Sequence, residues 1–126
     1  MRAADPRHTL GLLGEDLACR ELRRRGYAIL ARRHRSRFGE LDIVCSDAGV
    51  VVFVEVKARV TARRGTAAES LSPRKRRRIA AMALDYLAWT GRLNQRCRFD
   101  VVAIDGVGTP RQSLRVIENA FDVSGR

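Results

Sequence analysis

A chain of 126 residues with 45% hydrophobic and 31% charged residues has the composition of one globular domain, which excludes a disordered protein. Its longest apolar run, residues 49–54, is too short to span a membrane, and charged residues occupy the N-terminal stretch where a signal peptide needs an apolar segment. We therefore expect a cytoplasmic protein without a membrane partner. The net charge of +11 attracts polyanions, so nucleic acid is the expected partner, and a ribosome-associated or merely basic protein is the alternative.

The predicted elements follow one another in the order helix, three strands, helix and two strands. Apolar residues at helical spacing predict a first helix over residues 10–25. Runs of strand-forming residues predict strands at 27–31, continuing toward 35, at 38–45 and at 50–56. Residues 58–71 lack any period and predict a surface loop. Ser72 and Pro73 are typical of a helix start, the second helix ends at Gly91, and strands follow at 99–104 and 113–117.

This order of elements predicts an α/β fold with a mixed central sheet flanked by helices. Residues 1–126 form a single domain, in which residues 1–8 and 122–126 are expected to be flexible tails. The three cysteines, Cys19, Cys45 and Cys97, include no CxxC pair, so they are predicted to be buried free thiols and not a zinc site or a disulfide framework.

Four charged side chains fall at the same end of the second and third predicted strands. Because side chains alternate along a strand, Glu40 and Asp42 share one face of their strand. Glu55 and Lys57 share one face of the next strand. A hairpin that turns on residues 48–49 pairs Asp42 with Glu55, and it also places Glu40 opposite Lys57. Two opposed carboxylates repel each other, so this arrangement needs a compensating positive charge.

A divalent cation held by Asp42 and Glu55 would supply that charge, polarise a phosphodiester and activate water. Lys57 would then orient the water or stabilise the charge that develops on the phosphate. A surface salt-bridge cluster is the alternative, and it is weakened because unpaired charge is costly beside strongly apolar strands. Lys57 and Lys75 are the only lysines among 25 basic residues, which indicates positions that need a compact ammonium group.

Two further carboxylates are candidates for the same site. Glu15 lies at the margin of the apolar arc of the first helix, from where it can reach the edge of the sheet, and an ordinary exposed glutamate is the alternative. Glu40 is either an accessory site residue or a partner for Lys57.

The second helix begins with basic residues, where the helix dipole favours anions and disfavours cations. Arg74, Arg77 and Arg78 face outward on a helical wheel, whereas Lys75 lies one turn before Ile79, toward the apolar side. Together with exposed backbone amides they predict a site for the phosphates of a nucleic acid. A solvated basic face is the alternative.

Other residues that often carry function have an ordinary explanation here. His8 and His34 have no partners arranged for a nucleophilic triad or a zinc site. Tyr86 and Trp89 fall on the apolar stripe of the second helix, so they are predicted to be core residues and not platforms for base stacking. Asp100 is predicted to be a turn or salt-bridge residue.

Several segments taken together resemble the YraN-type family of bacterial predicted endonucleases, which is similar to the archaeal Holliday-junction resolvases of the PD-(D/E)xK nuclease superfamily. They cover nearly the whole chain and comprise residues 14–15 (GE), 39–44 (GELDIV), 52–57 (VFVEVK), 72–75 (SPRK), 98–102 (RFDVV) and 119–121 (NAF). The resemblance implies a restriction-endonuclease-like αβββαβ core. It also implies that Asp42 and Glu55 bind Mg²⁺ or Mn²⁺, with Val56 lending a backbone carbonyl. Lys57 would assist the attacking water, and Glu15 would complete the site.

Leu41 precedes Asp42 where the superfamily pattern has a proline, a departure that leaves the carboxylate in place. Because resolvases act as dimers on two-fold junctions, the likeness also implies a homodimer and branched DNA as the substrate, in repair or recombination. The leading hypothesis is a metal-dependent endonuclease that hydrolyses DNA phosphodiesters. The alternatives are a non-catalytic protein that uses the nuclease fold as a DNA- or RNA-binding platform, and a module whose basic face binds an acidic protein.

Overall fold

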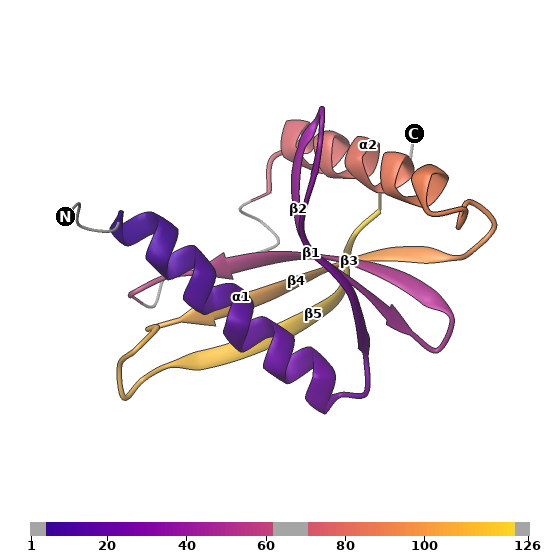
Figure 1. Ribbon diagram of the computed structural model, residues 1–126. Helices are drawn as coiled ribbons and strands as arrows, with labels where there is room; N and C mark the ends of the chain where they lie inside the picture. Colours follow the sequence, from indigo (N-terminus) through magenta and orange to yellow (C-terminus); the bar gives the residue numbers. More distant parts are fainter. Residues whose placement is uncertain (1–4, 62–70, 123–126) are drawn as a thin grey trace.

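The computed structural model describes residues 5–61 and 71–122, and its elements follow the predicted order. They form an α/β fold with a mixed sheet and two helices, consistent with a restriction-endonuclease-like core, so the predicted fold class is confirmed. The elements, drawn in Figure 1, are α1 (Pro6–Arg24), β1 (Ala28–Ser36), β2 (Gly39–Asp47), β3 (Val50–Ala58), α2 (Pro73–Trp89), β4 (Cys97–Asp105) and β5 (Ser113–Phe121).

The five strands lie side by side in the order in which they occur along the chain. Strands β1, β2 and β3 form an antiparallel meander, and β4 and β5 form an antiparallel pair. The two units meet at β3 and β4, which run parallel. A parallel pair needs a crossover connection, and α2 lies within it.

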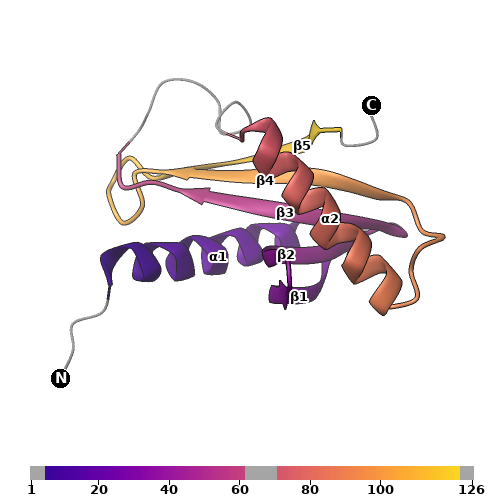
Figure 2. The ribbon, with the colours of Figure 1, turned by 90° about the horizontal axis from the view of Figure 1, so that it is seen from above.

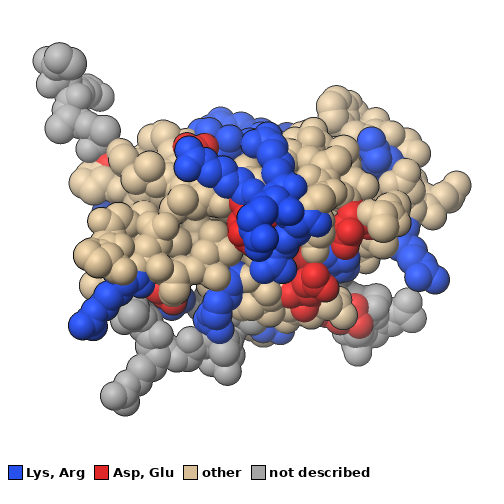
Figure 3. Space-filling view, turned by 90° about the horizontal axis from the view of Figure 1, so that it is seen from below, with Lys and Arg blue, Asp and Glu red and all other residues tan. Residues whose placement is uncertain are grey.

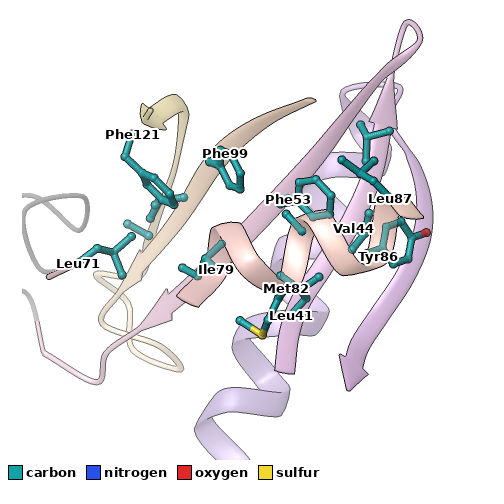
Figure 4. Close-up of a cluster of buried hydrophobic side chains, with 14 residues drawn as sticks. Leu41, Val44, Phe53, Leu71, Ile79, Met82, Tyr86, Leu87, Phe99 and Phe121 are labelled. Carbon is teal, nitrogen blue, oxygen red and sulfur yellow. The ribbon is translucent and has the colours of Figure 1, made fainter. Parts of the chain in front are cut away.

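The two helices cover opposite faces of the sheet, as the views in Figures 1 and 2 show. Successive side chains of β3 point to opposite faces, so Phe53 packs in the core under α2 and Val54 packs in the core under α1. The ring of Phe53 lies 5.9 Å from the ring of Tyr86 and 5.7 Å from that of Phe99, an arrangement visible in Figure 4. Burial on both faces explains the uninterrupted apolar run of this strand.

Both helices begin at a capping side chain followed by proline. Ser72 accepts a hydrogen bond from the backbone N–H of Lys75 at 3.1 Å, as the Ser-Pro pattern predicts. Asp5 caps α1 in the same way, so this helix begins at Pro6, earlier than predicted. Residues 6–8, which the sequence placed in a flexible tail, are therefore helical, whereas residues 1–4 and 123–126 lie outside the described residues. No helix within 5–61 and 71–122 is long and apolar enough to cross a membrane.

Three local predictions differ from the structure. Strands β1 and β5 extend further than predicted, to Ser36 and Phe121. Most of the predicted surface loop, 62–70, lies outside the described residues, so the loop stays a prediction. Trp89 is not a core residue, because 74% of it is exposed. Helical periodicity predicts which side of a helix is apolar but not where the covering sheet ends, and Trp89 occupies the last turn of α2. Cys97 is exposed, unlike the buried Cys19 and Cys45.

Candidate active site

The predicted carboxylates lie at one end of the β2–β3 hairpin. The observed pairing of Ile43 with Val54 is the register predicted from the turn at residues 48–49. Beyond this pair, the link between β2 and β3 is made by a side chain. Oδ2 of Asp42 accepts a hydrogen bond from the backbone N–H of Val56 at 2.8 Å. This bond fixes the carboxylate of Asp42 against the strand that carries Glu55 and Lys57.

Asp42 lines two separate hollows, one on each side of the sheet end. The first, which we call the α1 hollow, has a volume of about 300 Å³ and is lined by Arg7, Leu10, Gly11, Glu15, Asp42, Val56, Lys57 and Ala58. The second, the α2 hollow, has a volume of about 280 Å³ and is lined by Gly39, Glu40, Asp42, Glu55, Lys75, Arg78, Ile79 and Met82. The fold thus brings every predicted acidic side chain of the site to the wall of one of two adjoining hollows.

The carboxyl group of Asp42 is electrostatically unfavourable in its charged form. Burial, and after it the neighbouring charge of Glu55, raises its pKa to about 7. The hydrogen bond from Val56 and the charge of Lys75 lower the pKa, but they do not offset burial and repulsion. This carboxylate therefore lacks sufficient positive charge around it, which is the condition that a bound cation would relieve.

The two lysines of the chain meet at this site. Lys75 points inward, as its place on the helical wheel predicted, and its Nζ lies 3.0 Å from Oε1 of Glu55. Burial is the largest influence on the pKa of Lys75 and lowers it, but the charge of Glu55, the hydrogen bonds with Lys57 and Glu55 and the charge of Asp42 together outweigh burial, so the pKa is raised. For Lys57 the balance is opposite, because burial and then the contact with Lys75 lower its pKa. One lysine is thus held as a cation beside Glu55, and the other loses its proton more readily.

Glu15 reaches the α1 hollow, but arginines from β1 approach it. Its Oε1 lies 3.0 Å from Nε of Arg33 and 3.8 Å from Nη2 of Arg32, yet neither contact has hydrogen-bond geometry. Burial raises the pKa of Glu15 despite these two cations. Arg33 adopts a left-handed backbone conformation with φ of 49°, which is uncommon outside glycine and marks local strain beside the site.

A glycine sets the position of Glu15. A Cβ at Gly14 would lie 2.7 Å from the Cβ of Ala58, so only glycine lets α1 approach the end of β3 this closely. In the Gly14-Glu15 motif, Gly14 thus allows the close contact of helix and strand, and this contact places the side chain of Glu15 at the α1 hollow.

Of the two roles expected for Glu40, the pairing with Lys57 is wrong, and the role as an accessory site residue stays a prediction. Glu40 forms an ion pair of 3.3 Å with Arg35, because β1 supplies its cross-strand neighbour. Glu40 lines the α2 hollow and also a larger cavity of about 610 Å³ formed with His8, Arg32, Arg33 and Arg35. The sequence reasoning missed these arginines because it considered only the β2–β3 hairpin, and extending the antiparallel register to β1 would have found them.

The donor set suits a hard cation only in part. Carboxylate oxygens are the ligands that Mg²⁺ and Mn²⁺ prefer, and Asp42 has an oxygen besides the one that Val56 engages. Within 5–61 and 71–122, however, no three His, Cys, Asp or Glu side chains lie close enough to one another to hold a metal ion. Glu15 and Glu55 are each turned toward a cation of the protein, so a metal would have to displace Arg33 or Lys75 to gain a third carboxylate.

The start of α2 carries the predicted basic cluster. Arg74, Arg77 and Arg78 are exposed, and Arg78 also lines the α2 hollow beside the carboxylates. Because Arg78 lies both on α2 and in the wall of the α2 hollow, a polyanion bound along α2 would pass the entrance of the candidate site. Figure 3 views the face away from α2, where basic side chains also gather around the middle with acidic groups between them.

A second polar cluster lies at the opposite end of β3 and β4. Asp100 is fully buried, accepts from Arg98 Nε at 3.1 Å to Oδ1 and 3.2 Å to Oδ2, and accepts from the backbone N–H of Asn119 at 2.9 Å. Arg98 also donates to Asp47 at 3.0 Å and to the hydroxyl of Tyr27 at 2.9 Å. We call this cluster the Arg98 network. The salt-bridge role predicted for Asp100 is thus confirmed, with Arg98 two residues earlier on the same strand as its partner. The other members of the Arg98 network come from distant segments and left no local signal.

The comparison with known proteins agrees with this arrangement. The profile described as "Uncharacterised protein family UPF0102" matches residues 14–104. The chain belongs to the UPF0102 family. This is the YraN-type family of predicted endonucleases that the sequence motifs indicated, so that prediction is confirmed.

Relatives in the UPF0102 family are similar to this chain over most of their length. A protein of Pelotomaculum thermopropionicum is 46% identical over 120 residues, covering 94% of this chain and 99% of the relative. One of Anaeromyxobacter dehalogenans is 46% identical over 123 residues, covering 97% and 90%. Both are named only as UPF0102 proteins. Family membership therefore assigns no activity to this chain.

Proposed function

We propose that this UPF0102 protein is an Mg²⁺- or Mn²⁺-dependent endonuclease that hydrolyses phosphodiester bonds in DNA. The observation that carries the proposal is the pair Asp42 and Glu55, which lies at one strand end where burial and mutual repulsion raise the pKa of Asp42 to about 7. A protein gains nothing in stability from such a pair, and perturbed carboxyl groups in a hollow are typical of a functional site. The exposed arginines at the start of α2 provide the adjoining surface for phosphates.

Asp42 and Glu55 would hold the metal, with the carbonyl of Val56 and the carboxylate of Glu15 as further ligands on the α1 side. The metal would supply a polarised phosphate and an activated water. Val56 donates its N–H to one oxygen of Asp42 and so orients the carboxylate. Lys75 balances the charge of Glu55, with its Nζ 3.0 Å from Oε1.

Lys57 is the residue best placed to handle the proton of the attacking water. It lines the α1 hollow together with Asp42 and Glu15. Because burial and Lys75 lower its pKa, its neutral form is more accessible than that of an ordinary lysine, which suits a group that accepts a proton. Arg78 lines the neighbouring hollow and would bind a phosphate of the strand being cut.

Cleavage of branched, flapped and linear DNA with Mg²⁺ or Mn²⁺ tests the proposal. We expect Glu55→Gln and Lys57→Met each to lower the cleavage rate by at least about 100-fold, because each removes a group that acts in the transition state. Glu21→Gln is the matched control, since Glu21 pairs with Arg24 and Arg25 and lines neither the α1 hollow nor the α2 hollow. Activity that survives both site substitutions, or no activity on any of these substrates, would refute the mechanism.

A non-catalytic nucleic-acid-binding protein is the second candidate, and one observation favours it. Glu15 and Glu55 are both engaged by cations of the protein itself, Arg33 and Lys75. This hypothesis predicts salt-sensitive binding of nucleic acid that weakens when the exposed arginines of α2 are changed. The affinity should not change with Mg²⁺ or with the loss of Asp42. Calorimetric titration with Mg²⁺, on the parent and on Asp42→Asn, separates the two candidates: heat of binding that Asp42→Asn abolishes supports the nuclease.

A further inference from the structure

The exposure of Trp89 leaves a set of apolar side chains on the surface around the end of α2. Trp89 is 74% exposed, Leu84 is 62% exposed and Phe38, at the tip of the β1–β2 hairpin, is 38% exposed. A hollow of about 270 Å³ between hairpin and helix is lined by Arg37, Phe38, Ala81, Leu84, Asp85 and Ala88. We call the exposed Phe38, Leu84 and Trp89, together with the ring of His34 that contacts Trp89, the aromatic patch.

The rings of the patch are held in place from below. The ring of His34 lies 5.4 Å from that of Trp89 at a tilt of 33°, and it contacts Tyr86 edge-on at 5.1 Å. Tyr86 is itself a buried core residue. The indole therefore has one side supported by the protein and most of its surface open, so it can present a flat face to a ligand without first becoming ordered.

Positive charge lies near the rings of this region. The guanidinium of Arg37 lies 4.8 Å from the centre of the Phe38 ring, and the charge of Arg92 acts on Tyr86, whose ring contacts His34. Asp85 is the one acidic side chain in the wall of the hollow. Aromatic faces next to cations are the combination that binds unpaired bases together with their phosphates.

The patch is also aligned with the candidate active site. Arg78, in the α2 hollow, and Trp89 are 11 residues apart on one helix, which is about three turns and places both on the same side at a separation of about 17 Å. The basic half of α2 suits the phosphate backbone, and its last turn suits bases. A strand that follows the helix would meet both.

We propose that the aromatic patch stacks unpaired bases of the substrate, so that this protein prefers DNA with a single-stranded segment next to the cleavage site. This inference rests on the proposed function in requiring nucleic acid to lie along α2. Duplex bases are already stacked on one another, so Trp89 and Phe38 can engage only a base that lacks a partner.

Trp89 is the single tryptophan of the chain, so its fluorescence reports directly on the patch. The test titrates the full-length protein in EDTA with a short oligothymidylate and with an abasic oligonucleotide of equal length. Binding without metal separates stacking from cleavage: loss of cleavage with intact stacking would refute only the nuclease, and the converse would refute only the patch. We expect the oligothymidylate to quench the fluorescence and the abasic strand to leave it unchanged.

Two substitutions distinguish stacking from general apolar contact. Trp89→Leu keeps an apolar side chain but removes the ring, and it should weaken binding of a labelled oligothymidylate about five- to hundredfold. Trp89→Phe keeps a ring and should retain most of the affinity. Leu13→Ala is the control, since Leu13 is 49% exposed on α1 and should leave binding unchanged.

Three outcomes would overturn the inference. Equal quenching by the abasic strand would show that phosphates alone are bound, and unchanged affinity of Trp89→Leu would show that the ring is not used. Sedimentation that reveals a dimer dissociated by Trp89→Ala would assign the patch to a second copy of the chain.

Discussion

Asp42 and Asp100 are two aspartates on neighbouring parts of one sheet, and their surroundings differ in kind. Asp100 is fully buried, yet Arg98 donates to both of its oxygens and Asn119 adds a backbone N–H. Asp42 receives one backbone N–H and faces the like charge of Glu55. The comparison teaches that burial of a carboxylate by itself does not mark a functional site. A carboxylate whose donors match its charge is compatible with a stable fold, whereas one left beside a like charge is unfavourable in its charged form.

The largest expected effect on stability is in the Arg98 network, where the buried carboxylate has matching donors. Arg98→Met removes the cation from Asp100 and leaves a buried charge without compensation, so we expect the free energy of unfolding to fall by about 3–5 kcal/mol. Urea-induced unfolding measures this. Arg96→Met, at an exposed position two residues earlier, should change stability by less than about 0.5 kcal/mol. A loss below about 1 kcal/mol in Arg98→Met would show that the Arg98 network does not stabilise the fold.

At Asp42, by contrast, removing the charge of the side chain should stabilise the protein. The folded-state pKa of Asp42 is about 7, above its ordinary value of 3.8, so this group contributes stability that is present below pH 3.8 and lost as the pH rises through 7. Asp42→Asn lacks that loss and can still accept the N–H of Val56. At pH 8 it should be more stable than the parent by about 2–4 kcal/mol, with little difference near pH 4.

Thermal unfolding at both pH values, with and without Mg²⁺, checks this prediction. Mg²⁺ at pH 8 should stabilise the parent, by about 2.7 kcal/mol at a hundredfold excess over its dissociation constant, and leave Asp42→Asn unaffected. Equal pH dependence of the two proteins would contradict the raised pKa of Asp42.

A smaller effect is expected where α1 approaches the site. Gly14→Ala places a Cβ 2.7 Å from the Cβ of Ala58, so helix and strand must separate at a cost of about 1–3 kcal/mol, and Glu15 moves with the helix. Gly11→Ala meets nothing within 4 Å and should gain up to about 1 kcal/mol from helix propensity. Chemical denaturation of the two variants measures the difference, and equal stabilities would show that the close contact at Gly14 is not needed.

The smallest effect is expected at the exposed ion pair of the meander. The side chain of Arg35 is 86% exposed and pairs with Glu40 at 3.3 Å, so Arg35→Ala should cost no more than about 0.5 kcal/mol. The loss should also fade at high salt, because solvent ions screen exposed charges. A cost comparable to that of Arg98→Met would remove the distinction between exposed and buried pairs on which this comparison rests.

The sequence was most informative where local pattern determines geometry. The turn at residues 48–49 and strand alternation predicted the pairing of Ile43 with Val54 and hence the meeting of Asp42 with Glu55. Helical spacing predicted that Lys75 points inward, which its ion pair with Glu55 confirms. In both cases the residues involved are set by the period of a single hairpin or helix.

Features built from distant segments were not predictable in this way. The Arg98 network joins side chains from the residue before β1, the last residue of β2, and strands β4 and β5. No local sequence pattern connects Tyr27, Asp47 and Glu118. The error at Trp89 has a related cause, since its stripe is apolar but the extent of the covering sheet depends on other strands.

The single parallel junction of the sheet has a consequence for the order of folding. Ile43 and Val54 are 11 positions apart, whereas Val51 and Cys97 in the β3–β4 pair are 46 positions apart. Closing the longer loop costs more entropy before any contact rewards it, so the meander should form early and the β3–β4 junction late. Asp42 and Glu55 would thus meet on a nascent hairpin while the chain is still open.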